Sequence, residues 1–435
     1  MRPPLAEVAF VFLKLGVTGF GGPAAHIALM EEELVRRRRW LSAEHFAELL
    51  AAAQLMPGPN STELAIHLGY ARAGWAGLLA AGACFIAPAA LLVTALAWTY
   101  VRWGALPAVA SLLAGLQPAV VAVVAHAVWR LAGTALPTWT LRAIALAALA
   151  AALVGIDEIL LLVLAGAAAL LLRPREPGER AVAAGGRLAW AFALPGATAP
   201  AAAGAAGAFG LGALFLLFIK IGALLYGSGY VLVAFLRAEL VAERGWLTEA
   251  QLLDAVAAGQ VTPGPLFTTA TFVGYLLGGG AGAAVATAGI FLPAFLFVAV
   301  SGPLVPRLRA SPAARAFLSG VAAASLALMA AVTVALARTA LVDAPALLLG
   351  AAALVLLVRF GVPAGWVLLG AAAAGLALGA MRPAPRRLAR GSIRDQLSPV
   401  ATCQVPQPAR PPLPWYPPCP PQPSAHSSLP PVPPR

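Results

Sequence analysis

The chain has 435 residues, of which 61% are hydrophobic and only 11% are charged. Soluble domains carry about 25% charged residues, so this composition excludes an ordinary soluble protein and is typical of a membrane protein. The formal net charge of +12 comes from arginines in short loops and in the C-terminal region. Such a pattern orients a protein in the membrane, and it gives no reason to expect a nucleic-acid partner.

Apolar segments recur in two series along the chain. We predict them at 8–29, 74–102, 106–132, 139–155 and 157–172, and again at 208–236, 281–305, 313–340, 342–359 and 363–380. A helix of about 20 apolar residues crosses a hydrocarbon core of roughly 30 Å. We therefore expect an all-α polytopic protein of the inner (plasma) membrane, with about 10–12 transmembrane helices surrounded by the lipid bilayer.

Composition also predicts the domain organisation. We expect an N-terminal repeat at 1–172, a linker at 173–207, a C-terminal repeat at 208–381 and a Pro- and Arg-rich tail at 382–435. The tail has no apolar periodicity and cannot bury a core, so we expect it to be disordered.

The two halves repeat each other in sequence. Phe12-Leu13-Lys14-Leu15-Gly16 reappears as Phe218-Ile219-Lys220-Ile221-Gly222. The same shift relates Glu33 to Glu239, Trp40 to Trp246, Gln54 to Gln260, Pro57-Gly58-Pro59 to Pro263-Gly264-Pro265 and Thr62 to Thr268. Chance does not align so many Gly, Pro, Trp and Lys positions, so each half is one structural unit.

Loop charge indicates how the halves are oriented. The loop Arg36–Arg39 should be cytoplasmic, because cytoplasmic loops are rich in arginine and lysine. In the equivalent loop of the second half, Arg237 and Arg244 are balanced by acidic residues, and we read 208–236 as one crossing that places this loop outside. The charges therefore favour an inverted repeat, an arrangement common in secondary transporters.

The only two lysines, Lys14 and Lys220, occupy the same repeat position inside an apolar segment. A lysine within a membrane helix costs on the order of 2.5–3.5 kcal/mol on insertion scales, and such residues usually line a pathway or meet a partner. Alternatively, each amine extends to the membrane interface. We predict that the two lysines meet near the midplane and bind one dianion.

A Pro-Gly-Pro sequence in each half must break the helix that it interrupts, because proline lacks a backbone donor and disfavours helix in the residue before it. We expect a broken or re-entrant helix in each half at Pro57-Gly58-Pro59 and Pro263-Gly264-Pro265, followed by a new helix at Asn60-Ser61-Thr62 and near Thr268. Free amides at a helix N-terminus bind oxyanions, and paired broken helices often mark a transporter site. The alternative is a structural kink.

Three further features are candidates for the site. Gly21 and Gly22 either contact substrate or allow close helix packing, and Gln54 and Gln260 either donate to an anion or satisfy broken backbone. Glu63, whose repeat counterpart is Thr269, either carries a proton for coupling or complements a helix N-terminus. The histidines have no metal-ligand spacing, so we expect neither a metal nor another cofactor.

Together these residues resemble the chromate ion transporter (CHR) family in its long, two-domain form. The likeness lies in Phe-Leu-Lys-Leu-Gly followed by Phe20-Gly21-Gly22-Pro23, in Gln54-Leu55-Met56-Pro57-Gly58-Pro59, and in the second copy at 218–294. It implies an inner-membrane carrier that exports chromate, with sulfate as a related anion and energy from the membrane gradient. The paired lysines and broken helices lead us to expect alternating access about a midplane site, with protons or a counter-anion exchanged. The second copy has Tyr226-Gly227-Ser228-Gly229 at the first glycine-rich position, so the two halves need not contribute equally.

Two alternatives stay open at this point. The carrier could transport sulfate or another anion, because sulfate and chromate share charge and shape. A membrane-embedded enzyme acting on polyprenyl phosphates would need clustered carboxylates for Mg²⁺, and Asp157-Glu158 is the only adjacent acidic pair within the predicted membrane region. The sequence leaves open whether the chain forms a homo-oligomer.

Overall fold

The computed structural model describes residues 5–19, 22–104, 106–173, 210–226 and 229–381, with the side chains of 301–310 and 381 excepted. This part of the chain is helical and contains no strand. Most of the predicted linker 173–207 and the whole tail 382–435 lie outside the described residues.

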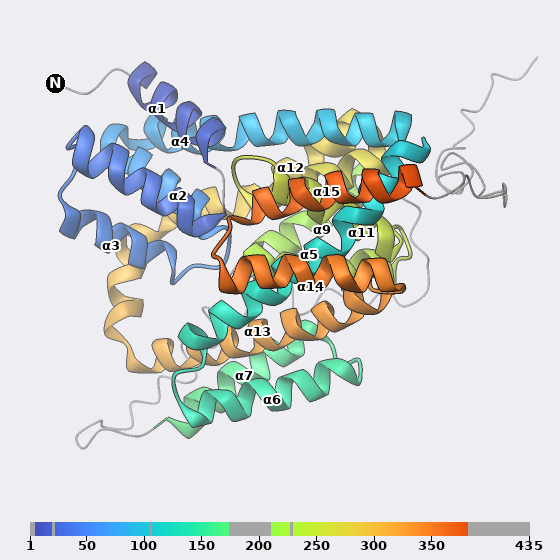
Figure 1. Ribbon diagram of the computed structural model, residues 1–435. Helices are drawn as coiled ribbons and strands as arrows, with labels where there is room; N and C mark the ends of the chain where they lie inside the picture. Colours follow the sequence, from blue (N-terminus) through green and yellow to red (C-terminus); the bar gives the residue numbers. More distant parts are fainter. Residues whose placement is uncertain (1–4, 20–21, 105, 174–209, 227–228, 382–435) are drawn as a thin grey trace, which may run out of the picture.

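The helices of the two halves follow one another in the same order (Figure 1). The first half contains α1 (Leu5–Thr18), α2 (Pro23–Met30) with the π-helix η1 (Glu31–Arg37), α3 (Ala43–Ala53), α4 (Asn60–Trp103), α5 (Pro107–Ala135), α6 (Trp139–Leu153) and α7 (Glu158–Leu172). The second contains α9 (Leu211–Leu224), η2 (Gly229–Val231), α10 (Leu232–Leu236) with the π-helix η3 (Arg237–Glu243), α11 (Glu249–Val261), η4 (Leu266–Thr268), α12 (Thr269–Ala310), α13 (Pro312–Ala340), α14 (Ala344–Arg359) and α15 (Ala364–Met381).

Local sequence explains where equivalent helices begin. Ser42 caps α3 by accepting the His45 N–H at 3.2 Å, and its counterpart Thr248 caps α11 by accepting the Gln251 N–H at 3.2 Å. Short polar side chains at such positions satisfy amides that have no partner within the helix.

Each of the longest helices reverses direction near its start. In α4 the reversal is at Ala73 and Gly74, where Gly74 has φ 63°, and in α12 it is at Gly279, with φ 60°. A Cβ added at Gly69 would overlap the carbonyl of Gly77, so a short first arm folds back on a long second arm. Glycine is required at the turn because other residues rarely adopt positive φ.

The first apolar segment of each half is also a hairpin, so the single crossing expected at 208–236 is wrong, and the apolar segment at 8–29 is likewise two helices. Lys14 of α1 pairs with Glu33 of η1 at 3.1 Å, and Glu7, earlier on α1, pairs with Arg38, just after η1, at 3.1 Å, so α1 runs antiparallel to the helix formed by α2 and η1. Gly22, with φ 78°, and Pro23 at the first turn of α2 permit the reversal. The prediction failed because hydropathy is equally high in a hairpin and in one continuous crossing.

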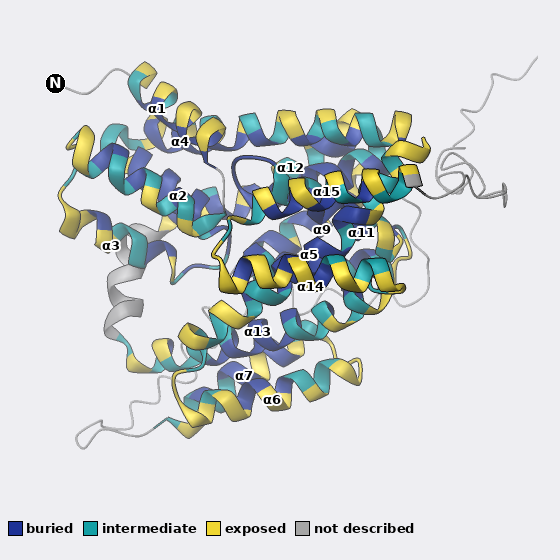
Figure 2. Cartoon of the chain, viewed as in Figure 1, coloured by how far each residue is buried: buried dark blue, intermediate teal, exposed yellow. Residues whose placement is uncertain are grey.

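The remaining apolar segments form the expected helices within a few residues. Among the described residues, four helices are long and apolar enough to cross a membrane, namely those at Asn60–Trp103, Pro107–Ala135, Leu266–Val300 and Pro312–Ala340, and five shorter apolar helices accompany them. Exposed residues lie along α4, α6 and α14 (Figure 2), and many of them are large and apolar, as expected of surfaces that face lipid.

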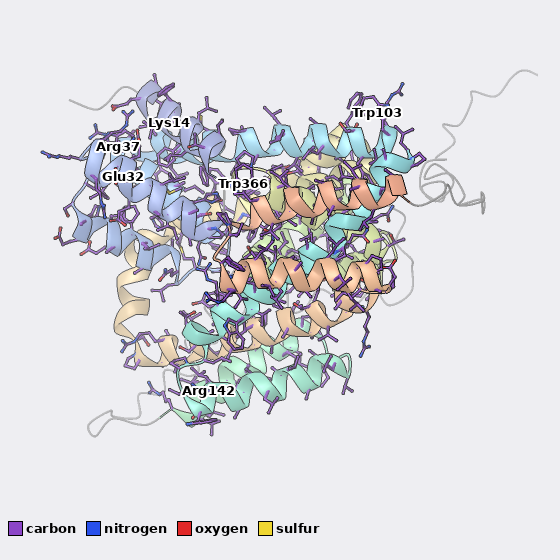
Figure 3. All side chains as sticks on the ribbon, viewed as in Figure 1. Lys14, Glu32, Arg37, Trp103, Arg142 and Trp366 are labelled. Atoms are coloured by element: carbon purple, nitrogen blue, oxygen red, sulfur yellow. The ribbon has the colours of Figure 1, made fainter. Side chains whose placement is uncertain are left out.

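The molecule has two ends, which the helices connect. Arg37 lies at one end and Trp103 at the other (Figure 3). Arg72, at the end of the first arm of α4, stacks on Trp40 at 4.8 Å and therefore belongs to the same end as Arg37. We call these the arginine end and the Trp103 end.

Candidate functional site

Two backbone hydrogen bonds join the halves at the centre of the molecule. The N–H of Gly58 donates to the carbonyl of Leu225 at 2.7 Å, and the N–H of Gly264 donates to the carbonyl of Gly19 at 2.8 Å. Gly58 and Gly264 are equivalent in the repeat, and so are Gly19 and Leu225. The bonds are thus related by the pseudo-symmetry of the chain, and each Pro-Gly-Pro turn is held by the first hairpin of the opposite half.

Both Pro-Gly-Pro turns have a backbone that only glycine adopts readily. Gly58 has φ 140° and Gly264 has φ 96°. After the first turn, α4 begins at Asn60 with Pro59 as its N-cap, and no side chain caps it. The prediction that a new helix starts after each turn is confirmed. In the second half, that start is the 3₁₀ turn η4, which leads into α12.

A cavity of about 1050 Å³ lies where these turns meet α5 and α13. Its wall includes Asn60 and Ser61 at the start of α4, Pro265 after the second turn, and Tyr226 and Gly229 after α9. The cavity extends along α5 as far as Ala135. Because α4 ends at Trp103 and α5 runs back from there, this part of the wall is at the arginine end.

The polar groups in the cavity wall suit an anion. They are Gln54, Asn60, Ser61, His126, Arg130, Thr134, Tyr226, Tyr230 and Ser325. Arg130 is exposed and forms no ion pair with a described carboxylate. No Asp or Glu is among the described lining residues. The wall therefore offers positive charge and hydrogen-bond donors without a competing carboxylate.

The structure brings only some of the predicted site residues to this cavity. Gln54, Pro59, Asn60, Ser61 and Pro265 line it. The structure does not place the following predicted residues in the wall: Gly22, Pro57, Gly58, Thr62, Gln260, Pro263, Gly264 and Thr268. Two of them are close to the lining residue Tyr230: the Gln260 side chain contacts it, and an added Cβ at Gly22 would be 3.9 Å from its hydroxyl. Gly21 lies outside the described residues.

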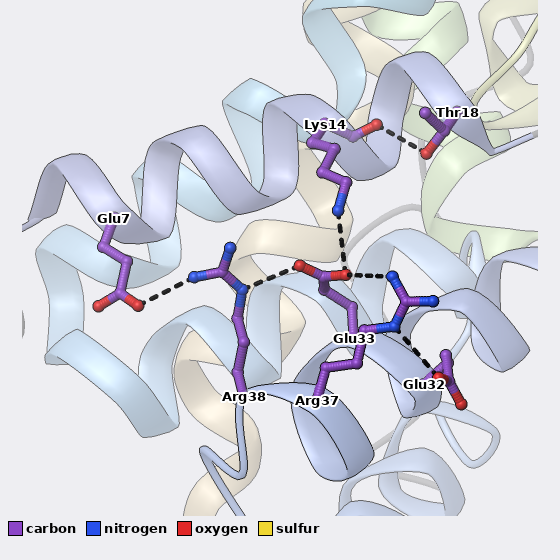
Figure 4. Close-up of polar contacts among 7 residues, drawn as sticks. All are labelled: Glu7, Lys14, Thr18, Glu32, Glu33, Arg37 and Arg38. Atoms are coloured by element: carbon purple, nitrogen blue, oxygen red, sulfur yellow. Dashed lines mark hydrogen bonds and ion pairs between the residues drawn. The ribbon is translucent and has the colours of Figure 1, made fainter.

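Neither predicted lysine lines the cavity. Lys14 pairs with Glu33, which also accepts from Arg38 at 2.9 Å, and Arg38 reaches Glu7 at 3.1 Å (Figure 4). Glu33 lies outside the candidate membrane spans. The hydrogen bond from Arg38 lowers the pKa of Glu33, against its desolvation, and Lys14 lowers this pKa further. Lys14 is therefore part of an ion-pair cluster between the arms of its own hairpin.

The second half repeats this arrangement. Lys220 pairs with Glu239, which also pairs with Arg244. The lysine side chains are each 42% exposed, and both glutamates follow their lysine by 19 residues. That conserved spacing between halves was the available signal for an ion pair within each hairpin.

Glu63 and His67 lie on the first arm of α4, close to the cavity but outside its wall. Glu63 is completely buried, and neither of its carboxylate oxygens has a hydrogen-bond partner among the described residues. His67 follows one helical turn later, and its Nε2 atom is likewise buried without a described partner. His26, in contrast, joins Gly19 O at 2.9 Å to Ser61 Oγ at 3.3 Å and has an evident structural role.

The sequence interpretation missed Arg130 and His126, which lie one turn apart on α5. Their repeat counterparts on α13 are Ala335 and Ala331. Both side chains occur in one half alone, so the internal repeat does not reveal them. Their signal was an isolated arginine and histidine within an apolar segment.

Comparison with known proteins gives the same division into halves. The family model for chromate transporters matches residues 6–171 and 212–376. A probable chromate transport protein of Synechococcus elongatus is 35% identical over 352 residues, covering 81% of this chain and 89% of the relative.

Two further relatives agree. The chromate transport protein of Cupriavidus metallidurans is 36% identical over 372 residues, with 82% of this chain and 88% of the relative covered. That of Pseudomonas aeruginosa is 36% identical over 356 residues, with 80% and 85% covered. No solved structure matches.

The apolar helices and these relatives identify a multi-pass transporter of the plasma membrane. With both halves matched by the family model and with relatives that align over most of its length, the chain belongs to the chromate transporter family.

Proposed function

We propose that this protein is a secondary transporter that exports chromate from the cell by alternating access. The observation that carries the proposal is the central cavity, whose described wall contains Arg130 and several hydrogen-bond donors but no carboxylate. The names of three relatives supply the substrate.

Arg130 is the principal binding residue in this proposal. Its guanidinium presents paired donors that match a tetrahedral oxyanion. At an effective dielectric of about 20 and a separation of 4 Å, opposite unit charges attract by roughly 4 kcal/mol before desolvation is subtracted. One third of that energy corresponds to about tenfold in affinity.

The hydroxyl and amide groups of the same wall complete the site. Asn60 and Ser61 line the cavity at the uncapped start of α4, and Tyr226 also lines it, donating its hydroxyl to the Gln54 carbonyl at 3.2 Å. Helix N-termini favour anions through these amides and through the helix dipole.

An inverted arrangement of the halves supports alternating access. A Cβ at Gly82 of α4 would overlap the Phe295 ring of α12, and Leu78 of α4 shares a buried cluster with Val298 of α12. The later residue on α4 thus meets the earlier residue on α12, so the two long arms pack antiparallel. Equivalent helices that run antiparallel are related by a pseudo-two-fold axis in the membrane plane, as in inverted-repeat transporters.

The charge of the two ends supports export. Among the residues whose side chains the structure describes, the arginine end carries Arg36–Arg39, Arg72, Arg142, Arg173, Arg315 and Arg359, whereas the Trp103 end carries Arg102, Arg237, Arg244 and Arg338. A second cavity, lined by Leu153, Glu158, Arg237 and Arg338, supports this grouping because the α6–α7 connection is at that end. The arginine end is then cytoplasmic, and the main cavity extends toward it.

Lys14 and Lys220 take an indirect part in this proposal. Each holds the two arms of its hairpin together through Glu33 or Glu239, and the first arm of each hairpin ends at the carbonyl that receives a Pro-Gly-Pro N–H. The lysines thus support the position of the opposite turn, and Arg130 meets the anion.

The test is chromate uptake into everted membrane vesicles, in which export from the cytoplasmic face appears as uptake. We expect saturable uptake and about a tenfold higher KM in R130Q, with sulfate as a competitor. The matched control is R142Q, because Arg142 belongs to the same end but stacks on Trp139 at 4.7 Å, outside the cavity. Equal KM values for both variants would remove Arg130 from the site, and absence of uptake by the parent would refute chromate export.

A further inference from the structure

A buried carboxylate without a partner lies beside the first Pro-Gly-Pro turn. Glu63 has no exposed surface, and no described donor reaches either of its oxygens. A Cβ at Gly58 would overlap Glu63 Oε1, so the carboxyl group is directed at the turn itself. An ionised carboxylate with neither a hydrogen bond nor a counter-ion is very costly in such a place, whereas the neutral acid is tolerated.

The described groups around Glu63 include no lysine or arginine paired with it. Tyr226, from the end of α9, is near enough to interact with it electrostatically. His67 lies on the same arm of α4 as Glu63. His26 lies on α2, and its two ring nitrogens form hydrogen bonds with Gly19 O and Ser61 Oγ. The side of α12 that faces the turn is apolar there, with Ala294 at 3.9 Å from the Gly58 position. No described Lys or Arg forms an ion pair with Glu63.

His67 lies on the route from Glu63 to the arginine end. The first arm of α4 runs from Asn60 at the centre to Arg72, so Glu63 and His67 lie one above the other at an i, i+4 spacing. The Nε2 atom of His67 is buried and unpaired among the described residues. An imidazole in that position can accept a proton at one nitrogen and release one from the other.

The second half lacks both groups. The counterpart of Glu63 is Thr269, whose hydroxyl donates to Leu266 O at 2.9 Å, and the counterpart of His67 is Phe272. Because the repeat otherwise preserves this turn, the carboxyl and imidazole are additions specific to the first half.

We propose that Glu63 and His67 form the site of the coupling proton, which enters the cell as the oxyanion leaves. When the site faces outward, the Glu63 carboxylate takes up one proton from the periplasm. When the site faces the cytoplasm, as here, the O–H bond of Glu63 breaks and its proton passes through His67 to the cytoplasm. The carboxylate is thereby regenerated, and no bond to the oxyanion forms or breaks. Entry of the proton moves positive charge into the cell, and exit of the oxyanion moves negative charge out. The membrane potential, negative inside, therefore drives both movements.

This inference rests on the proposed function, and the test separates the two. Purified protein is reconstituted in liposomes that contain a pH-sensitive dye, at alkaline pH where chromate is a dianion. Chromate–chromate counterflow requires no net proton movement and tests transport alone. Proton movement driven by an imposed chromate gradient tests the coupling. If the parent lacks counterflow, chromate transport itself fails; if it shows counterflow without proton movement, only the coupling fails.

The variants assign the proton to its site. We expect E63Q to retain counterflow within about threefold while losing chromate-driven proton movement, and H67Q to slow that movement at least tenfold. The matched control is E48Q, whose carboxylate is exposed on α3.

Three results would overturn the proposal. One is proton movement of parental size in E63Q. Another is a sodium gradient replacing the proton gradient at constant pH, which would make the site one for Na⁺. The third is loss of counterflow in both E63Q and E63D. If the variant that keeps a carboxylate also lost counterflow, Glu63 would have a purely structural role.

Discussion

The amide of Gly58 and the carbonyl of Leu225, one from each half, form a hydrogen bond of 2.7 Å at the centre of the protein. Its symmetry mate joins Gly264 to Gly19 at 2.8 Å. These bonds fix the position of the first helix of each half relative to the Pro-Gly-Pro turn of the other half. Residues next to both turns form part of the wall of the main cavity.

The first prediction concerns this crossed pair. In G264A the new Cβ would be 2.7 Å from the Ala89 Cβ, at a φ of 96° that alanine adopts only with strain. We expect a loss of about 1–3 kcal/mol in stability, seen as a lower melting temperature in detergent, and reduced chromate uptake. The control is G370A, where an added Cβ meets nothing within 4 Å. A melting temperature for G264A equal to that of G370A would contradict the model of the turn.

The second prediction separates two roles for the lysines. If Lys14 acts through Glu33, then K14M should impair uptake modestly, and E33Q should impair it at least as much, because Glu33 also pairs with Arg38. K220M and E239Q should differ in the same way, because Glu239 also pairs with Arg244. The lysine side chains are 42% exposed, and the ion pair of such a side chain contributes about 0–1 kcal/mol, so we expect K14M and K220M to change KM by about fivefold or less. Uptake abolished in K14M but normal in E33Q would instead place the amine on the anion.

The third prediction concerns orientation. Ser42 and Thr248 cap equivalent helices and are both exposed. In a cysteine-free background, an impermeant thiol reagent added to intact cells should label T248C and should label S42C only after permeabilisation. Equal labelling of both in intact cells would require parallel halves.

The fourth prediction concerns Asp254, which joins α11 to the scaffold. Tyr100 donates its hydroxyl to Asp254 Oδ2 at 3.0 Å, and Gln117 donates Nε2 to Oδ1 at 3.0 Å. D254A leaves both donors unpaired, so we expect a loss of about 1–3 kcal/mol and a lower melting temperature. The same substitution at exposed Glu48, its repeat counterpart, should have little effect; if E48A lowers the melting temperature as much, the buried contacts of Asp254 are unimportant.

The fifth prediction concerns the C-terminal region. Because residues 390–435 have no apolar periodicity, a chain that ends at residue 389 should insert and transport chromate like the parent. Immunoblotting of membranes and vesicle uptake measure the two properties separately. Normal insertion without uptake would assign this region a role in transport.

Sequence alone predicted the parts of the fold that depend on local chemistry. The repeat gave two equivalent units, and proline chemistry gave a new helix at Asn60 after the first turn. It did not predict that 8–29 folds back on itself, because a hairpin whose arms pack together is as apolar as a crossing. The ion pair of Lys14 with Glu33 is the interaction that distinguishes them.

The candidate site was predicted only where it coincides with the repeat. Gln54, Asn60 and Ser61 lie at the cavity because they flank the repeated turn. Arg130 was missed because its distance from that turn along the chain is large, and only the packing of α5 brings it near. An isolated arginine in an apolar segment signals a functional residue, but it does not indicate which other helices pack beside it.

The crossed hydrogen bonds also bear on how such a chain can be divided. A half produced alone has a donor at Gly58 or Gly264 but lacks the carbonyl that accepts it, since that carbonyl belongs to the other half. Two separately encoded halves would therefore form a working unit only by associating, and one of them would have to enter the bilayer upside down relative to the other. Fusion into a single polypeptide guarantees equal numbers of the two orientations.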